Sequence, residues 1–171
     1  KYTDALEYMK KALNIYCKVY GKTHIVTATS YNAIGCIYDD LANYKEAIDY
    51  KNKALLILEH IFRDAHPNKA DIHDSIGRTY ANMCEWEIAL NHKINALKIR
   101  EIVFGTEHTI TATSYQNVGY IYSNLGKCQE ALYYLKKALN VWLKIFGESH
   151  ANIATTYDNI GCTYGQLGLH E

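Results

Sequence analysis

Residues 104–139 read FGTEHTITATSYQNVGYIYSNLGKCQEALYYLKKAL, and the pattern in this stretch occurs four times along the 171 residues. From Gly77 to Gly119, as between every pair of neighbouring copies, the spacing is 42 residues. Three columns of identical residues mark the copies: Gly35, Gly77, Gly119 and Gly161; Tyr38, Tyr80, Tyr122 and Tyr164; His24, His66, His108 and His150. Because no insertion breaks the register, each copy is predicted to be one structural unit stacked on the next.

Each period predicts two helices. From His24 to Leu41, small and apolar residues recur three and four positions apart, which is one helical face, and we call this segment the A helix. From about Tyr44 to Phe62, a second stripe that includes Ala47 marks the B helix. The chain therefore reads as four B–A pairs, an all-α arrangement of eight antiparallel helices.

Turn residues support these boundaries. Gly21, Gly105 and Gly147 follow B helices and Gly126 and Gly168 follow A helices, where a left-handed residue is favoured. Arg63 takes the glycine's place in one copy, so that turn is expected to be built differently. Pro67 suits the first position of a helix and makes His66 the N-cap, and the other periodic histidines are expected at the same corner. Asn43 and Glu46 fit a capping box.

Small residues recur where helices are expected to approach closely. The columns are Ala5, Ala47, Ala89 and Ala131, then Ala12, Ala54, Ala96 and Ala138, and the glycines of the A helices. A glycine inside a helix costs about 1 kcal/mol relative to alanine, so four in register indicate close packing. The periodic tyrosines are interpreted as packing residues between helices.

Composition excludes several function classes. Lys and Arg total 18, as do Asp and Glu, so the formal net charge is zero. A long-range electrostatic attraction of the whole chain to nucleic acid or to an anionic membrane surface is therefore not expected. No apolar run reaches the roughly 18–20 residues that span a bilayer. The five cysteines have no C-x-x-C spacing and are expected to be buried, reduced thiols in a cytoplasmic protein.

Motifs for chemistry are not found. The chain contains no G-x-S-x-G, phosphate loop or H-E-x-x-H, so no catalytic residue and no cofactor is predicted, and the protein is not expected to be an enzyme. Metal binding is the alternative interpretation of the periodic histidines, beside helix capping. Zinc needs nitrogens about 2.0–2.1 Å from one ion, whereas neighbouring packed helices lie about 8–10 Å apart, so capping is favoured and no metal site is predicted.

The columns resemble the tetratricopeptide repeat. The A-helix motif is Tyr31-Ile34-Gly35-Tyr38 in one copy and Tyr115-Val118-Gly119-Tyr122 in another, and the two alanine columns match the B helix of that family. The longer period is similar to the kinesin light chain type. The resemblance implies a right-handed α-α superhelix whose A helices line a concave groove. It predicts one array over residues 1–171, with units at 1–23 (B only), 24–65, 66–107, 108–149 and 150–171 (A only).

By this resemblance, residues one step off the packed face line the groove. The candidate peptide-binding residues are Asn32, Asp39, Asp71, Asp74, Arg78, Gln116, Asn117, Tyr120, Asp158 and Asn159. Their amides suit an extended peptide backbone. With Asp40, the predicted groove contains five aspartates, and Arg78 is the one positive charge among the groove columns. A neutral or basic segment of a partner is therefore expected rather than an acidic one. The centre of the site is predicted at Asp71, Asp74, Asn117 and Tyr120.

Three interpretations of function remain open. The first is a non-catalytic scaffold that binds a peptide segment, as a cargo adaptor does. The second is a structural spacer whose ends or convex face make the contacts, and the third is a regulatory array attached to a catalytic domain such as an NTPase. Since neither end carries the polar cap of a solenoid, the chain is interpreted as a fragment of a longer array, and end-to-end self-association is expected.

Overall fold

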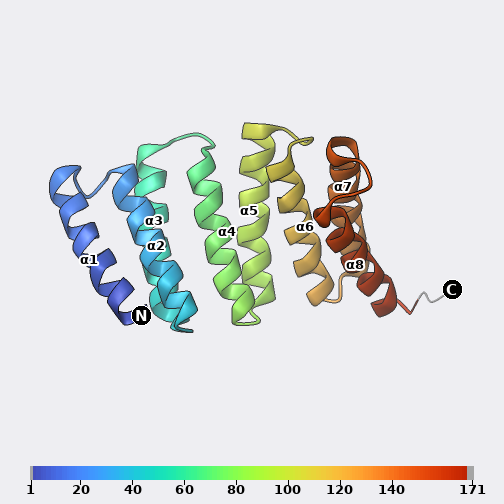
Figure 1. The fold of residues 1–171 in the computed structure, drawn as a ribbon, viewed down its shortest axis with the longest axis horizontal. Helices are drawn as coiled ribbons and strands as arrows, with labels where there is room; N and C mark the ends of the chain where they lie inside the picture. Colours follow the sequence, from blue (N-terminus) through green and yellow to red (C-terminus); the bar gives the residue numbers. More distant parts are fainter. Residues whose placement is uncertain (1, 169–171) are drawn as a thin grey trace. The chain divides into compact units, whose positions relative to one another are not determined.

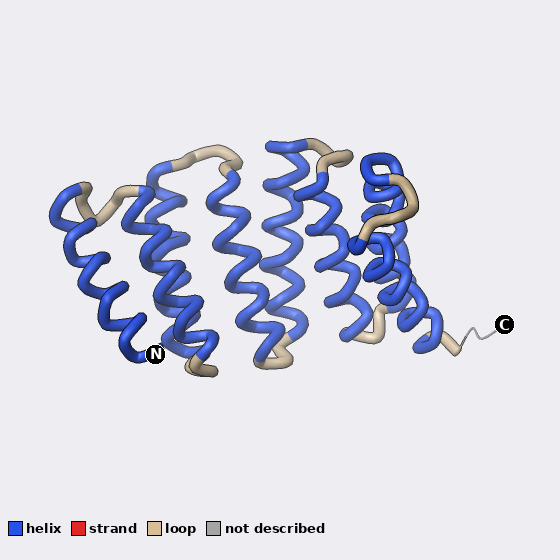
Figure 2. The backbone as a smooth tube through the Cα atoms, viewed as in Figure 1, coloured by secondary structure: helices blue, strands red, loops and turns tan. Residues whose placement is uncertain are grey.

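A computed structural model describes residues 2–168, and within that range every regular element is an α-helix (Figures 1 and 2). The helices are α1 (Tyr2–Val19), α2 (Ile25–Asp40), α3 (Tyr44–Ile61), α4 (Pro67–Asn82), α5 (Trp86–Phe104), α6 (Thr109–Asn124), α7 (Cys128–Phe146) and α8 (Ala151–Gln166). The all-α prediction is confirmed. No helix between residues 2 and 168 combines the length and the hydropathy of a bilayer-spanning segment.

The chain forms two compact units that meet in sequence between Glu85 and Trp86. In the first unit, α1 packs on α2, α2 packs closely on α3, and α4 contacts both α3 and α2. Consecutive helices run antiparallel, as Figure 1 shows for α1 to α4. The core of this unit is a cluster of buried aliphatic residues, namely Ala28, Ala54, Leu58, Ile72 and Ile76.

The second unit repeats the arrangement. Here α5 packs on α6, α6 packs closely on α7, and α8 contacts both α7 and α6. Its largest buried side chains include Trp142, Tyr115 and Leu135. In both units, therefore, the A helices (α2, α4, α6 and α8) alternate with the B helices (α1, α3, α5 and α7).

Two glycines allow the A and B helices to touch. A Cβ atom at Gly35 would lie 2.7 Å from Lys51 Cγ and 3.0 Å from the carbonyl oxygen of Ala47 in α3. A Cβ atom at Gly119 would lie 2.7 Å from Leu135 Cγ and 3.1 Å from the carbonyl oxygen of Ala131. At such distances a Cβ atom would force Lys51 or Leu135 to shift, so the predicted close approach is confirmed for these two glycines.

Tyrosines pack beside these contacts. The ring of Tyr50 lies between those of Tyr31 and Tyr38, with centroids 6.0 and 5.4 Å away. In the second unit Tyr134 takes the same place between Tyr115 and Tyr122, at 6.2 and 5.6 Å. Burial and a hydrogen bond to Glu101 raise the pKa of Tyr115 well above its usual value. The packing interpretation is therefore confirmed for these six tyrosines, but it is wrong for Tyr8 and Tyr157, which are exposed.

The four periodic histidines cap the A helices. Each Nδ1 accepts a hydrogen bond, at 3.1–3.2 Å, from the backbone N–H two residues further along. Each ring also stacks on an aromatic ring four residues earlier, a column that the sequence interpretation missed: Tyr20, Phe62, Phe104 and Phe146. Among residues 2–168, no three His, Cys, Asp or Glu side chains gather as ligands for a metal ion.

Two predictions about local structure were wrong. Asn43 is the N-cap of α3 but makes no side-chain capping hydrogen bond, so the expected capping box does not form. The five cysteines are free, as expected, but only Cys128 is buried, and Cys84 and Cys162 are exposed.

The turns after the A helices need a left-handed residue. Gly126 and Gly168 supply it with φ of 70° and 68°, and in the preceding copies Ala42 and Cys84 adopt φ of 54° and 60° in the same column. For a residue with a Cβ atom this conformation costs roughly 1–2 kcal/mol. The turns after α2 and α4 are therefore strained, whereas those after α6 and α8 are not.

We expect Ala42→Gly to raise the free energy of unfolding by about 1 kcal/mol, because glycine carries no steric penalty at positive φ. The matched control is Ala154→Gly near the start of α8, which we expect to lower the free energy of unfolding by up to about 1 kcal/mol through the helix propensity of glycine. Urea denaturation measures both changes, and a destabilising Ala42→Gly would contradict the assignment of strain.

Candidate functional site

The candidate residues divide between the two units, and each set is described by itself. In the first unit they lie on α2 and α4, and in the second on α6 and α8. We call these surfaces the first and second A-helix faces. The predicted centre includes residues of both units, Asp71 and Asp74 on α4 and Asn117 and Tyr120 on α6, so their convergence remains a prediction.

A buried ion pair lies beneath the first A-helix face. The ammonium group of Lys51, a residue of α3, contacts Asp39 Oδ2, and both side chains are almost inaccessible, at 0% and 6% exposure. Lys51 Nζ also donates to the carbonyl oxygen of Ser75 at 3.1 Å and to Thr79 Oγ1 at 2.6 Å. All three ammonium protons therefore have acceptors. Burial lowers the pKa of Lys51, and the hydrogen bond to Asp39 opposes that shift.

This pair changes the electrostatics inferred from the sequence. Asp39 does not present its charge to the surface, because its side chain is turned inward onto Lys51. Its Oδ1 atom is buried without a hydrogen-bond partner among the described residues, as is Asn32 Oδ1. The sequence interpretation counted Asp39 as a groove charge and overlooked Lys51. The available signal was a lysine on the apolar stripe of a B helix, between Ala47 and Ala54.

Arg78 joins the edge of the network. Its guanidinium group lies 4.0 Å from Asp39 Oδ2 and 3.5 Å from Cys36 Sγ, while the side chain remains 57% exposed. Cys36 Sγ in turn lies 3.7 Å from Ser75 Oγ. Of the remaining acidic candidates, Asp71 is exposed and Asp74 is half-buried. The first A-helix face therefore presents Asp71 and part of Asp74 at its surface, and Arg78 is the accessible cation among the candidate residues.

The second A-helix face is polar but nearly uncharged. Gln116, Asn117 and Asn159 are half-buried, and their side-chain amides make no hydrogen bond within residues 2–168. Asp158 is exposed at the surface of α8. Tyr120 is 49% exposed, and its ring meets the edge of Trp86 with centroids 6.5 Å apart. Trp86 was missed because its column holds Tyr44 and Cys128 in the neighbouring copies.

The same packing position is filled differently in the two units. Leu135 stands where Lys51 stands, and Ser123 stands where Asp39 stands, two periods further on. Leu135 is fully buried, and Ser123 Oγ lies 3.2 Å from Thr163 Oγ1 and donates to Gln166 Oε1 at 2.9 Å. The second unit thus provides an uncharged counterpart of the buried ion pair.

We expect Lys51→Leu to lower the free energy of unfolding by about 3 kcal/mol, because it leaves the Asp39 carboxylate buried without its cation. The double variant Lys51→Leu/Asp39→Ser copies the second unit. We expect its free energy of unfolding to lie within about 1 kcal/mol of that of the parent chain. Urea denaturation of both variants checks this expectation. A double variant no more stable than Lys51→Leu would show that the uncompensated charge is not the cause.

Comparison with known proteins gives the family. A family model described as tetratricopeptide repeat matches residues 1–60, 68–143 and 117–171. No curated protein matches the chain.

Solved structures show the same fold. The Podosopora anserina putative kinesin light chain with nearly identical TPR-like repeats is 18% identical, with 98% of this chain and 79% of that chain covered and a TM-score of 0.84. BtubC (BKLC) from P. vanneervenii is 20% identical, with 98% and 65% covered and a TM-score of 0.80. The apo form of RapI is 18% identical, with 98% and 44% covered and a TM-score of 0.81. At these identities the likeness is one of fold, and it is shared by proteins with different names.

Proposed function

The chain belongs to the tetratricopeptide repeat family, a family of protein–protein interaction scaffolds, and we propose that its two A-helix faces bind an extended peptide segment of a partner protein. In this proposal the protein is a non-catalytic adaptor-like module of the cytoplasm that uses no cofactor. The similarity of fold to a putative kinesin light chain supports the proposal of an adaptor-like module. Of the alternatives, a spacer leaves these faces without a ligand, whereas a regulatory array serves a catalytic domain to which it is attached.

The observation that carries the proposal is the set of unused amides on the second A-helix face. Gln116, Asn117 and Asn159 are held by rigid helices, and their amides have no hydrogen-bond partner among the described residues. Each amide offers both a donor and an acceptor. A peptide backbone presents the same two groups at every residue, so it can pair with such side chains whatever its sequence.

Tyr120 supplies an apolar contact beside these amides. Its ring is half exposed and is supported at one side by Trp86, so its orientation is constrained before a ligand binds. Exposed aromatic residues of this kind are frequent anchors in interfaces because they bury a large area with few rotatable bonds. We propose that a side chain of the bound segment packs on the free face of Tyr120.

The first A-helix face sets the charge preference. Asp40 and Asp71 are exposed, and Asp74 is half-buried, whereas Arg78 is the accessible cation of the candidate set. Since Lys51 neutralises Asp39, the preference for a neutral or basic segment rests on the three other aspartates and on Asp158. Like charges across an interface are unfavourable, so acidic segments are expected to bind poorly.

We expect Tyr120→Ala and Asn117→Ala each to weaken peptide binding about tenfold, because each removes a contact at the centre of the site. A peptide array identifies the segment, and fluorescence anisotropy measures its affinity. Tyr133→Ala is the matched control, since Tyr133 is 56% exposed but lies on the B helix α7. Equal effects of Tyr120→Ala and Tyr133→Ala would place the peptide elsewhere.

The charge preference has its own test. We expect the double variant Asp71→Lys/Asp74→Lys to weaken a lysine-rich version of the selected peptide about tenfold and to strengthen a glutamate-rich version. Both effects should shrink as salt is added, because these charges lie near solvent. Unchanged affinities in titration calorimetry would exclude the first A-helix face from the site.

A further inference from the structure

A lysine occupies the same position of the B helix in three of the four copies, namely Lys11, Lys53 and Lys137. Two of these lysines form an ion pair on their own helix. Lys11 pairs with Glu7 at 2.5 Å, and Lys53 pairs with Asp49 at 2.6 Å. In both cases the carboxylate lies four residues before the lysine, a spacing that suits an ion pair on a helix surface.

The third lysine, Lys137, lacks this partner. Tyr133 stands four residues before it in place of an acid, and Lys137 forms no hydrogen bond or ion pair with any residue between 2 and 168. Its ammonium group lies instead over two aromatic rings, 5.0 Å from the centroid of Tyr115 and 4.9 Å from that of Tyr133. Such contacts orient the cation but provide no oxygen acceptor for its three N–H groups.

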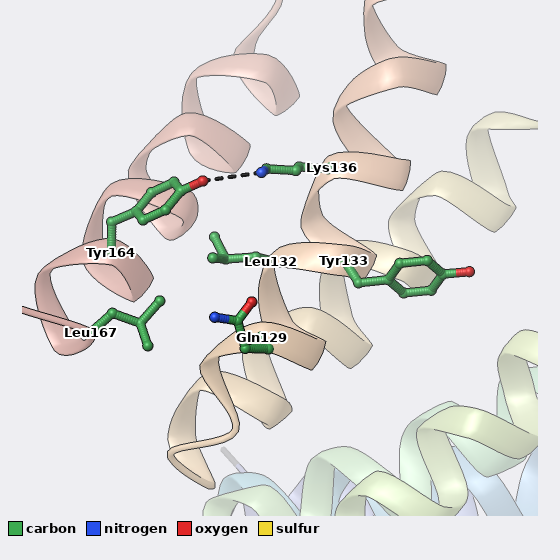
Figure 3. A pocket seen from close by; sticks show the side chains of 6 residues that line it. All are labelled: Gln129, Leu132, Tyr133, Lys136, Tyr164 and Leu167. Carbon is green, nitrogen blue, oxygen red and sulfur yellow. Dashed lines mark hydrogen bonds between the residues drawn. The ribbon is translucent and has the colours of Figure 1, made fainter. Parts of the chain in front are cut away.

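The neighbouring lysine of α7 differs in this respect. Lys136 Nζ donates to the Tyr164 hydroxyl of α8 at 3.0 Å, beside an open pocket of about 280 Å³ (Figure 3). Figure 3 also shows that the Tyr133 ring extends away from Tyr164. Lys136 therefore belongs to the contact with α8, whereas Lys137 lies where α7 borders the turn between α5 and α6.

Beside this turn, Lys137 lines a second open pocket, of about 220 Å³. All of its lining residues belong to the second unit, and they are Thr106, Glu107, Tyr115, Lys137, Asn140 and Val141. We call it the Lys137 pocket. Tyr115 and Val141 are only 2% and 4% exposed, so they give the pocket an apolar floor. Since small-molecule sites have volumes of about 300–1,000 Å³, this pocket suits one or two side chains rather than a cofactor.

The polar groups of the Lys137 pocket suit an anion. Thr106 and Asn140 are exposed, and their side chains form no hydrogen bond within residues 2–168, so a hydroxyl and an amide donor line the pocket together with the ammonium group. Glu107 is the one carboxylate among the lining residues, and it is already paired with Lys144. A carboxylate accepts hydrogen bonds from all three kinds of donor, and a bond between ionised groups is roughly twice as strong as a neutral one.

We propose that the Lys137 pocket binds an aspartate or glutamate side chain of a partner protein, together with an apolar residue beside it. The carboxylate then has the role at Lys137 that Asp49 has at Lys53 in the first unit. The apolar residue packs on Tyr115 and Val141. This site uses none of the candidate residues of the A-helix faces, and its charge preference is the opposite of theirs, so the two surfaces select different segments.

Short peptides with one glutamate at varied distances from one leucine, in an otherwise serine-glycine chain, test the proposal. Each has a counterpart with glutamine in place of glutamate, and fluorescence anisotropy measures the affinities. We expect Lys137→Gln to weaken the best glutamate peptide about tenfold, because it removes a hydrogen bond between charged groups. The matched control is Lys53→Gln, which should leave the affinity unchanged because Lys53 is already paired with Asp49.

Two substitutions of Tyr133 make the decisive comparison. Tyr133→Asp supplies the acid that the first unit has at this position, so its carboxylate should pair with Lys137 and compete with the peptide. Tyr133→Asn has nearly the same shape without the charge. We expect the glutamate peptide to bind Tyr133→Asp about threefold more weakly than Tyr133→Asn. Because Tyr133 is 56% exposed, both variants are expected to fold, and thermal melts check this.

The two proposals can fail separately. Lys137→Gln should leave unchanged the affinity of the peptide selected for the A-helix faces, because Lys137 is not among their residues. The proposal of an acidic partner is overturned if glutamate peptides bind no better than their glutamine counterparts. It is also overturned if Lys53→Gln weakens binding as much as Lys137→Gln, or if Tyr133→Asp and Tyr133→Asn bind the glutamate peptide equally.

Discussion

The contact on which the fold depends is the approach of an A helix to the backbone of its B helix. At Gly35 and Gly119 the missing Cβ lets a carbonyl oxygen of α3 or α7 come within about van der Waals distance of the A-helix backbone. That approach leaves the tyrosine rings to pack beside the contact, and it turns the polar side chains of the A helix toward its other side. The faces available for partners are thus fixed by where a side chain of the B helix packs on a glycine of the A helix.

The two units show that this contact tolerates different chemistry around it. In the first unit, the aliphatic stem of Lys51 covers Gly35. Its ammonium group donates hydrogen bonds to Asp39, Ser75 and Thr79. In the second, Leu135 covers Gly119 and a serine replaces the aspartate. Burying a charge pair is not more stabilising than burying leucine, so stability alone does not explain the pair. Its visible effect is to remove one negative charge from an otherwise acidic surface.

The sequence predicted what depends on periodicity and missed what depends on departures from it. The helices, the histidine caps and the left-handed glycines follow from columns that repeat every period. Ala42 and Cys84 were missed because neither residue type favours positive φ. Backbone hydrogen bonds close both turns, from the Asn43 N–H to the Tyr38 carbonyl oxygen and from the Glu85 N–H to the Tyr80 carbonyl oxygen. The Lys51–Asp39 pair was missed because it joins α3 to α2 through side chains 12 positions apart, and one-dimensional patterns do not show which columns face each other. The candidate residues were placed on the correct helices, but Asp39 was assigned an exposure that it does not have.

Complete burial of the Lys51 amine has a consequence for the kinetics of the folded state. A reagent that acylates amines reaches exposed lysines at once, but it reaches Lys51 only when α3 separates from α2 and α4. The rate at which this one side chain is modified therefore reports how often the first unit opens. An ion pair that contributes little to net stability thus provides a chemical probe of how often the first unit unfolds locally.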